Sequence, residues 1–426
     1  MARKIPAGGI NLFQLIYILI REYKERTGQE PMNLSLGNPD LIPDQRILDL
    51  QSQFAKDRAY DLHTYAEDKN LNHFAEGMVY VHSGVAAEKY SHLRVLPIAG
   101  IKTASSILPL ACGLHLPDKE RRKTFNIVTN LPAYDVIGTW STSYLATNRI
   151  VWPLLSQDNM RLNMDLLRGA LDKARVAKPD MIFVIRPGNP AAVGARADEW
   201  KALIDFCIQN QIRLVNDGAY AGLAAGNHVS LAYVAKDYPD LEWIEMFSVS
   251  KSFSDPGARL GAMIGSKEFV EDFVLVKGNT DSGPVPSVMA AYGEFFKDKQ
   301  TTAAVLSDLQ QTYSKRLTYV TSTLERAGFQ RACQTDAGFF TLWKAPTSIL
   351  GRDLVKESQE TNTPHAEVLN KTIISETGLV GVHFTGFTAD GNPDPLLRYA
   401  VCSDVLVPAF KERFEQALQS LKPRYT

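Results

Sequence analysis

The sequence has no excess of charge of either sign, few cysteines and no long apolar runs. Its 46 Lys and Arg residues nearly balance 47 Asp and Glu residues, which gives a formal net charge of -1. A chain of this kind offers no electrostatic case for binding nucleic acid or an acidic membrane surface. The 426 residues also contain no internal repeat, low-complexity tract or disordered linker. We therefore expect an ordinary globular protein, long enough for two domains.

The four cysteines lie far apart, at Cys112, Cys207, Cys333 and Cys402. No Cys-x-x-Cys pair and no nearby His doublet accompanies them, so their spacing indicates neither a metal site nor a disulfide framework. We expect buried, reduced thiols in a cytoplasmic protein.

The apolar stretch at residues 10–20 imitates a signal peptide, because basic residues precede it. Asn11 and Gln14 interrupt it, a charged run follows, and no small-residue cleavage site appears. The stretch is also too short to span a bilayer. We expect residues 1–20 to form an amphipathic helix or arm.

Apolar, β-branched segments alternate with helical periods from about residue 90 to 265, which is the pattern of an α/β sheet with helices on its faces. Past residue 300 we expect a long helix to about Ala327, a strand at Phe339–Trp343 and another around Leu397–Val401. These indicate a second, smaller domain. The strands expected in the first part are 92–98, 124–129, 149–155, 181–185, 212–215, 243–247 and 259–264.

The most informative segment runs from Ser248 to Gly261 and begins where a mostly buried strand ends. Ser248 and Ser250 can donate hydrogen bonds to phosphate oxygens, and Arg259 offers a planar fork of donors that pairs with phosphate. A lysine amine such as that of Lys251 becomes nucleophilic when burial and a neighbouring cation lower its pKa, and it then forms Schiff bases with carbonyl compounds. The segment therefore points to pyridoxal phosphate (PLP). The alternative for any lone lysine is a surface residue after a strand.

Polar residues also follow neighbouring strands of the expected sheet, where an open α/β sheet places its ligands. A buried carboxylate at Asp217 would hold a proton on a pyridine nitrogen, and the phenol of Tyr220 would donate to the 3-oxygen of the ring. Taken alone, Asp217 would be a helix cap or turn residue. The amide of Asn189 can donate to the same ring oxygen. The alternative is that Asn189 only begins a turn, since Asn-Pro is a common turn sequence.

Two further segments fit the same ligand. Gly100, Ile101 and Lys102 lie where a strand passes into a helix, and their backbone N–H groups would cradle a phosphate; an ordinary tight turn is the alternative. Tyr134 follows the next strand, where it would either stack on the pyridine face or pack into the core.

Together these segments resemble the signature of class I and II aminotransferases, the fold-type I family of PLP enzymes, from about residue 30 to 405. The resemblance implies a large domain with a mostly parallel central sheet flanked by helices, and a smaller α+β domain. We place an arm at 1–20, the small domain at 21–54 and 300–426, and the large PLP-binding domain at 55–299. The chain departs from the family at Asp255, where an apolar residue is usual, and at Ala191-Ala192, where the family has Thr-Gly.

The resemblance adds three more candidates. Tyr65 matches the tyrosine that reaches the phosphate of the neighbouring subunit's cofactor, which implies a homodimer with shared active sites, although the usual glycine of that segment is absent. Arg398 matches the late arginine that binds the substrate carboxylate; a structural ion pair is the alternative for an arginine in an apolar strand. Gly37 matches an early glycine-proline loop whose backbone approaches the substrate, and Asn189 also borders the substrate.

We therefore expect a PLP-dependent aminotransferase that moves an amino group from an L-amino acid to a 2-oxo acid by a ping-pong mechanism. Lys251 would hold the cofactor as an internal aldimine and then act as general base and acid, with Asp217 and Tyr220 as its catalytic partners. A carbon-sulfur β-lyase of the same fold and a non-catalytic PLP-binding regulatory domain are the alternatives. The amino acid is open, because no Arg lies between Asp281 and Ser287, where some relatives recruit one from the partner.

Overall fold

The structure is a computed structural model that describes residues 12–116, 121–134, 136–224 and 226–425. These residues form two compact units. The larger unit contains residues 38–313 and 334–338, and the smaller unit contains residues 12–37, 314–333 and 339–425. Residues 1–11 of the expected N-terminal arm lie outside the described part.

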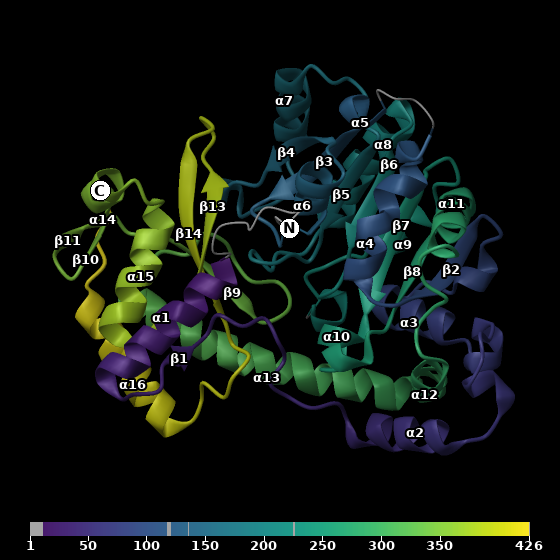
Figure 1. Cartoon of the computed structure of the whole chain (residues 1–426), viewed down its shortest axis with the longest axis horizontal. Helices are drawn as coiled ribbons and strands as arrows, with labels where there is room; N and C mark the ends of the chain where they lie inside the picture. Colours follow the sequence, from purple (N-terminus) through teal and green to yellow (C-terminus); the bar gives the residue numbers. More distant parts are fainter. Residues whose placement is uncertain (1–11, 117–120, 135, 225, 426) are drawn as a thin grey trace, which may run out of the picture. The chain divides into compact units, whose positions relative to one another are not determined.

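The larger unit is built on a seven-stranded sheet in the order β2-β8-β7-β6-β5-β3-β4 (Figure 1). The strands β7, β6, β5, β3 and β4 pair in parallel, and β8 is antiparallel to both of its neighbours. The expected α/β fold with a mostly parallel sheet is thus confirmed. The strands are β2 Leu93–Ile98, β3 Asn126–Leu131, β4 Asn148–Pro153, β5 Met181–Ile185, β6 Arg213–Asp217, β7 Trp243–Ser248 and β8 Gly261–Ser266.

The strands are buried between helices, which explains why β5 and β7 are nearly continuous apolar runs. Val215 and Met246 share one hydrophobic cluster with side chains from α4 (Ile101–Pro109) and α11 (Lys267–Lys277). Because side chains alternate along a strand, Asp217 and Ser248 lie on the same face as these two residues. Further helices that pack on the sheet are α3 (Phe74–Ser83), α7 (Met164–Ala174), α8 (Ala197–Asn210) and α9 (Leu231–Ala235).

The remaining helices complete the larger unit. Helices α2 and α12 pack on each other, and the long helix α13 begins in this unit and ends in the smaller one. Short single turns connect strands to the main helices. The bounds are α2 Gln45–Lys56, α5 Arg121–Thr124, α6 Val136–Thr139, α10 Val249–Ser252, α12 Pro286–Lys297 and α13 Lys299–Arg326.

The smaller unit holds a three-stranded antiparallel sheet in the order β13-β14-β9, which covers Val382–Phe387, Pro393–Ala400 and Phe340–Lys344. Two short pairs join β1 (Met32–Asn33) to β12 (Leu379–Val380) and β10 (Ser348–Ile349) to β11 (Arg352–Asp353). Ile16 of the amphipathic helix α1 packs against Ile374 and Val382, as its sequence pattern predicts. The helices are α1 Leu12–Thr27, α14 Leu354–Thr361, α15 His365–Thr377 and α16 Pro408–Leu421.

Several details differ from expectation. Strand β8 begins at Gly261 and not at Arg259, because Arg259 has a left-handed backbone with φ +50° and ψ +46°. Strand β6 extends to Asp217, so this carboxylate ends the strand and does not follow it. Only two of the four cysteines are buried: Cys112 and Cys402 are partly exposed. Among the described residues, no helix is long and apolar enough to cross a membrane.

Candidate active site

The strand ends of the larger unit bring most candidate residues to one edge of the sheet. Ile98 at the end of β2 and Ser248 at the end of β7 both pair with Gly261, the first residue of β8. Asp217 at the end of β6 pairs with Ile185 at the end of β5. This carboxyl-end edge is where open α/β sheets bind ligands. The segments that follow these ends carry Gly100, Asn189 and Lys251.

Ser248 fixes the turn that carries Lys251. Its side chain caps α10, since the Oγ accepts a hydrogen bond from the Ser250 N–H at 3.1 Å. The Ser248 hydroxyl also lies 2.8 Å from the Ser250 hydroxyl and 3.3 Å from the Leu260 carbonyl oxygen. Lys251 is partly buried in this turn. Ser248, Ser250 and Lys251 thus belong to one capped turn at the end of β7.

Burial at the end of β6 raises the pKa of Asp217 to about 6. A hydrogen bond from the Ala219 N–H at 3.0 Å and the positive charge of Lys251 oppose this rise. Asp217 pairs with Met246 of β7, and Lys251 lies three residues after the end of that same strand. A protonated pyridine nitrogen would supply the positive partner that makes the ionised carboxylate favourable. The environment of Asp217 thus fits the PLP ring.

The aromatic and amide candidates lie on loops next to this edge. The Tyr134 N–H donates to the Asn189 carbonyl oxygen at 2.6 Å, which joins the loops after β3 and β5. The Tyr134 ring is 40% exposed, so it is not packed into the core. The amine of Lys102 lies 3.3 Å from the Tyr134 hydroxyl. Tyr220 is buried beside Gly338.

Gly100 and Arg259 meet at the amino end of α4. Gly100 has φ +90°, and a Cβ atom on it would lie 2.7 Å from Nη2 of Arg259. Only glycine fits this conformation and this contact. The first N–H groups of a helix have no partner within the helix, so the α4 amino end and the guanidinium provide donors for one anion. The donor set fits the phosphate of PLP.

A histidine that the sequence did not single out contacts Ser252, the residue after Lys251. Nε2 of His82, on α3, is 2.7 Å from the Ser252 hydroxyl, and Nδ1 is 2.8 Å from the Met78 carbonyl oxygen. Burial lowers the pKa of His82 to about 4, so the ring is neutral near pH 7. Nδ1 then donates to Met78 and Nε2 accepts from Ser252. No sequence signal links His82 to Ser252, because 170 residues separate them.

A second buried network supports the strand ends from the opposite face. The Asn216 amide donates to the Arg186 carbonyl oxygen at 2.9 Å and to Glu245 at 2.7 Å, and its oxygen accepts from the Arg186 N–H at 2.9 Å. Glu245 is fully buried, and burial raises its pKa. It accepts further hydrogen bonds from Ser230 and from the Leu231 and Ala232 N–H groups.

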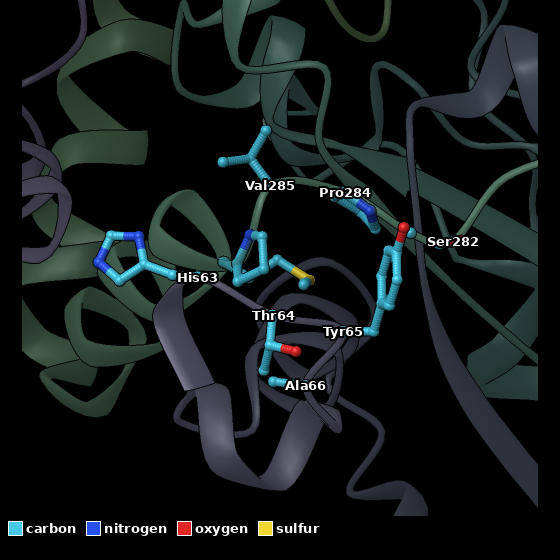
Figure 2. A pocket seen from close by; sticks show the side chains of 10 residues that line it. His63, Thr64, Tyr65, Ala66, Ser282, Pro284 and Val285 are labelled. Atoms are coloured by element: carbon cyan, nitrogen blue, oxygen red, sulfur yellow. The ribbon is translucent and has the colours of Figure 1, made fainter. Parts of the chain in front are cut away.

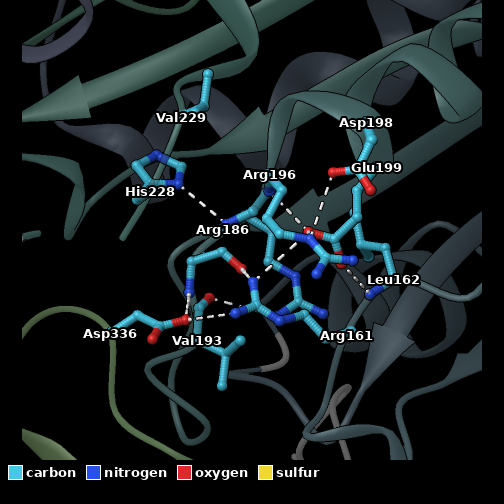
Figure 3. Close-up of polar contacts among 12 residues, drawn as sticks. Arg161, Leu162, Arg186, Val193, Arg196, Asp198, Glu199, His228, Val229 and Asp336 are labelled. Carbon is cyan, nitrogen blue, oxygen red and sulfur yellow. Dashed lines mark hydrogen bonds and ion pairs between the residues drawn. The ribbon is translucent and has the colours of Figure 1, made fainter. Parts of the chain in front are cut away.

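The loop that carries Asn189 is also anchored at its far side (Figure 3). Arg161 donates to the Gly194 carbonyl oxygen at 3.1 Å and pairs with Asp336 at 3.2 Å, while Asp336 accepts from the Gly194 N–H at 3.1 Å. The side chain of Arg186 donates to the Val193 carbonyl oxygen at 3.4 Å. These contacts fix both ends of the segment from Arg186 to Gly194.

Tyr65 is 85% exposed and borders a cavity of about 540 Å³ (Figure 2). No other predicted site residue lines this cavity, whose walls are His63–Ala66, Ser282–Pro286 and Met289.

The smaller unit brings Arg398 and Gly37 together. Arg398 is 2% exposed, donates to the Ser35 carbonyl oxygen and lies over the Phe340 ring at 4.3 Å from its centre. A Cβ atom on Gly37 would lie 2.8 Å from Cζ of the same Phe340 ring. The ring therefore packs against both residues.

Known proteins are similar to the chain in sequence and in fold. The family described as aminotransferase class I and II matches residues 121–411. LL-diaminopimelate aminotransferase of Syntrophobacter fumaroxidans is 25% identical over 414 residues, which cover 96% of this chain and 95% of that protein. A single-mutant aspartate aminotransferase of Thermus thermophilus has a TM-score of 0.74 at 16% identity, covering 99% and 98% of the two chains. An aromatic aminotransferase from Pyrococcus horikoshii has a TM-score of 0.69 at 16% identity, covering 94% and 97%.

Proposed function

The chain belongs to the class I and II aminotransferase family and is a PLP-dependent aminotransferase, and we propose that Lys251, Asp217 and Tyr220 are its catalytic residues. The observation that supports this proposal is that Asp217 and Lys251 lie at the ends of the neighbouring strands β6 and β7, on the edge where Arg259 lies against Gly100. The relatives are named as aminotransferases, which favours transamination over the carbon-sulfur lyase reaction.

When bound, PLP supplies an electron sink for the negative charge that develops on the α-carbon of the substrate. Nζ of Lys251 would hold the cofactor, and the freed amine would move a proton between the α-carbon of the substrate and the 4'-carbon of the cofactor. The carboxylate of Asp217 keeps the proton on the ring nitrogen. The Tyr220 hydroxyl and the Asn189 amide donate to the ring 3-oxygen.

The remaining candidates hold and orient the cofactor. The guanidinium of Arg259 binds the phosphate as a fork, together with the hydroxyls of Ser248 and Ser250. The ring of Tyr134 stacks on the pyridine face. The backbone N–H groups that complete the phosphate cradle are those of Gly100, Ile101 and Lys102.

For the substrate, we propose that Arg398 binds the α-carboxylate and that Gly37 and Asn189 are further substrate-binding residues. The side chain of Arg398 is buried, and a guanidinium can donate two parallel hydrogen bonds to a carboxylate. Because two similar proteins are LL-diaminopimelate aminotransferases, LL-diaminopimelate is the first amino donor to test. A 2-oxo acid then receives the amino group in the second half of a ping-pong cycle.

We also propose a homodimer in which Tyr65 reaches the phosphate bound by the partner subunit. The support is the high exposure of Tyr65 and of Val285, which is 54% exposed and borders the same cavity. Mixing Tyr65→Phe chains with Lys251→Ala chains tests this arrangement. Shared sites predict that mixed dimers regain activity absent from both parents, because one of their two sites carries neither change.

We place the enzyme in the cytoplasm. All four cysteines are free thiols, which suits a reducing compartment. Fractionation of cells that express the tagged chain checks this, and recovery from an oxidising compartment would contradict it.

A spectral titration of the purified holoenzyme with a panel of amino acids tests the catalytic assignment. We expect a visible cofactor band that an amino donor removes and a 2-oxo acid restores. Borohydride should fix the cofactor on Lys251 in the wild type and not in Lys251→Ala. A cofactor that borohydride still fixes to a lysine in Lys251→Ala would overturn the assignment. Pyruvate release from a sulfur amino acid without any 2-oxo acid would instead support the lyase.

A further inference from the structure

Asp255, which departs from the family pattern, joins three segments of the larger unit through one carboxylate. Its Oδ1 accepts a hydrogen bond from the Ala258 N–H at 3.2 Å. Its Oδ2 accepts from the Tyr292 hydroxyl of α12 and from the Gln51 amide of α2, both at 2.9 Å. No described lysine or arginine forms an ion pair with Asp255. Its negative charge is therefore directed at neutral donors.

The carboxylate caps a turn that is flanked on both sides by a residue with an unfavourable left-handed backbone conformation. Ser254 has φ +53° and Arg259 has φ +50°, and neither residue is a glycine. Between them Pro256–Ala258 form a single 3-10 turn that begins at Asp255. Left-handed conformations of such residues persist only where the surrounding contacts fix them. The three hydrogen bonds of Asp255 are contacts of this kind.

The position of the Arg259 guanidinium depends on this turn. Nη1 of Arg259 donates to the Pro256 carbonyl oxygen at 3.2 Å, and Nη2 lies against Gly100 at the amino end of α4. Arg259 is itself exposed, so little side-chain packing holds it. The contacts that orient it come from the backbone of the turn.

Tyr292, which donates a hydrogen bond to Asp255, is packed in an aromatic cluster. Tyr292 is fully buried, and its ring lies 5.9 Å from that of Phe253 and 5.8 Å from that of Phe296. Burial and the nearby Asp255 carboxylate raise the pKa of Tyr292 well above its usual value, so its hydroxyl remains a donor. An apolar residue at position 255 would leave this buried hydroxyl without its acceptor.

We propose that Asp255 is a positioning residue for the cofactor phosphate. Held by Tyr292 and Gln51, it fixes the turn that carries Arg259 to the anion cradle at Gly100. The inference rests on the proposed role of Arg259 and Gly100 in holding phosphate. It predicts that Asp255 governs the affinity for the phosphate group and not the affinity for the pyridine ring.

Equilibrium titration of apoenzyme with PLP and with pyridoxal, which lacks the phosphate, separates the two affinities. We expect Asp255→Ala to weaken PLP binding by about tenfold or more, the effect of one lost charge-assisted hydrogen bond, and to change pyridoxal binding by less than about twofold. Asp255→Asn should lose less, because its amide oxygen still accepts from the Ala258 N–H. Tyr292→Phe should weaken PLP binding in the same selective way.

Asp165→Asn is the matched control, since it removes a carboxylate that is 91% exposed in the same unit. Equal loss of PLP and pyridoxal affinity in a folded Asp255 variant, or no loss of either, would overturn the inference. If Asp255→Ala does not fold, Asp255→Asn and Tyr292→Phe decide by the same criterion.

The variant Arg259→Ala distinguishes a failure of the proposed phosphate site from a failure of the positioning role of Asp255. If Arg259→Ala loses no preference for PLP over pyridoxal, the proposed phosphate site is wrong. If it loses that preference and the Asp255 and Tyr292 variants keep it, only the positioning role of Asp255 is wrong.

Discussion

At the scale of single residues, burial decides which charges the site contains before any ligand arrives. Asp217 and His82 lie near Lys251, and burial favours the neutral form of both. In the apoenzyme, burial disfavours the ionised form of Asp217, whereas a protonated pyridine ring would stabilise that carboxylate. For His82 it fixes one ring nitrogen as the acceptor for Ser252.

Asp217→Asn should stabilise the apoenzyme at pH 7 and abolish most of its activity. The folded pKa of Asp217, about 6, lies above its ordinary value of 3.8. The contribution of Asp217 to stability is therefore full below pH 3.8 and is lost as the pH rises through 6. Removing the carboxyl should raise the free energy of unfolding at pH 7 by about 1–3 kcal/mol. Urea unfolding and kcat measure the two effects; a less stable apo variant with normal kcat would contradict the role of Asp217.

His82 should make the apoenzyme less stable in mild acid. Its folded pKa of about 4 lies below the ordinary value of 6.5, so its contribution to stability is full above pH 6.5 and is lost as the pH falls through 4. His82→Gln should reduce the pH dependence of the unfolding free energy by up to about one proton between these values. The wild-type slope should not vanish, because burial also lowers the pKa of His228 and of His383. An unchanged slope in His82→Gln would show that this ring titrates normally.

At the scale of elements, the site depends on where strands stop and which turn follows. Strand β2 passes through Gly100 into α4, β7 passes through the Ser248 cap into α10, and β8 starts after the left-handed Arg259. Each junction presents backbone donors or a side chain at the same sheet edge. At the amino end of α4, Nη2 of Arg259 lies against Gly100.

Gly100→Ala should weaken PLP binding by about tenfold or more, because the added Cβ displaces the Arg259 guanidinium and is strained at φ +90°. Gly169→Ala in α7 is the control, since a Cβ there meets nothing within 4 Å. That control should keep PLP affinity and gain about 0.5–1 kcal/mol of stability from helix propensity. Cofactor titration and thermal unfolding measure both variants. Equal PLP affinity in the two would argue against the cradle at α4.

At the scale of the whole molecule, the two units are built from interleaved stretches of sequence. The cofactor candidates belong to the larger unit, and Arg398 with Gly37 to the smaller. The Ser35 and Arg398 segments of the smaller unit meet although 363 residues separate them. The family match runs through residues of both units.

PLP should stabilise the whole chain by mass action. Because the unfolded chain has no assembled cradle, PLP at 100 times its dissociation constant should add about 2.7 kcal/mol to the free energy of unfolding. The thermal midpoint of the apoenzyme should rise with PLP concentration, and the rise should be smaller for Arg259→Ala. A midpoint independent of PLP concentration would contradict cofactor binding by the folded chain.

The sequence by itself determined the fold class, the family and the identity of the cofactor. Apolar strand segments that alternate with helical periods are local patterns and mark the strands of a mostly parallel sheet. The motif around Lys251 is contiguous in the sequence. Both can therefore be recognised without coordinates. The roles of Asn189, Tyr65 and Arg398 stay predictions that the experiments above can test. Only the tertiary structure decided what surrounds these residues. It revealed the His82–Ser252 pair, the Asn216–Glu245 network and the contacts of Asp255, because side chains far apart in sequence become neighbours only when the strands and helices pack.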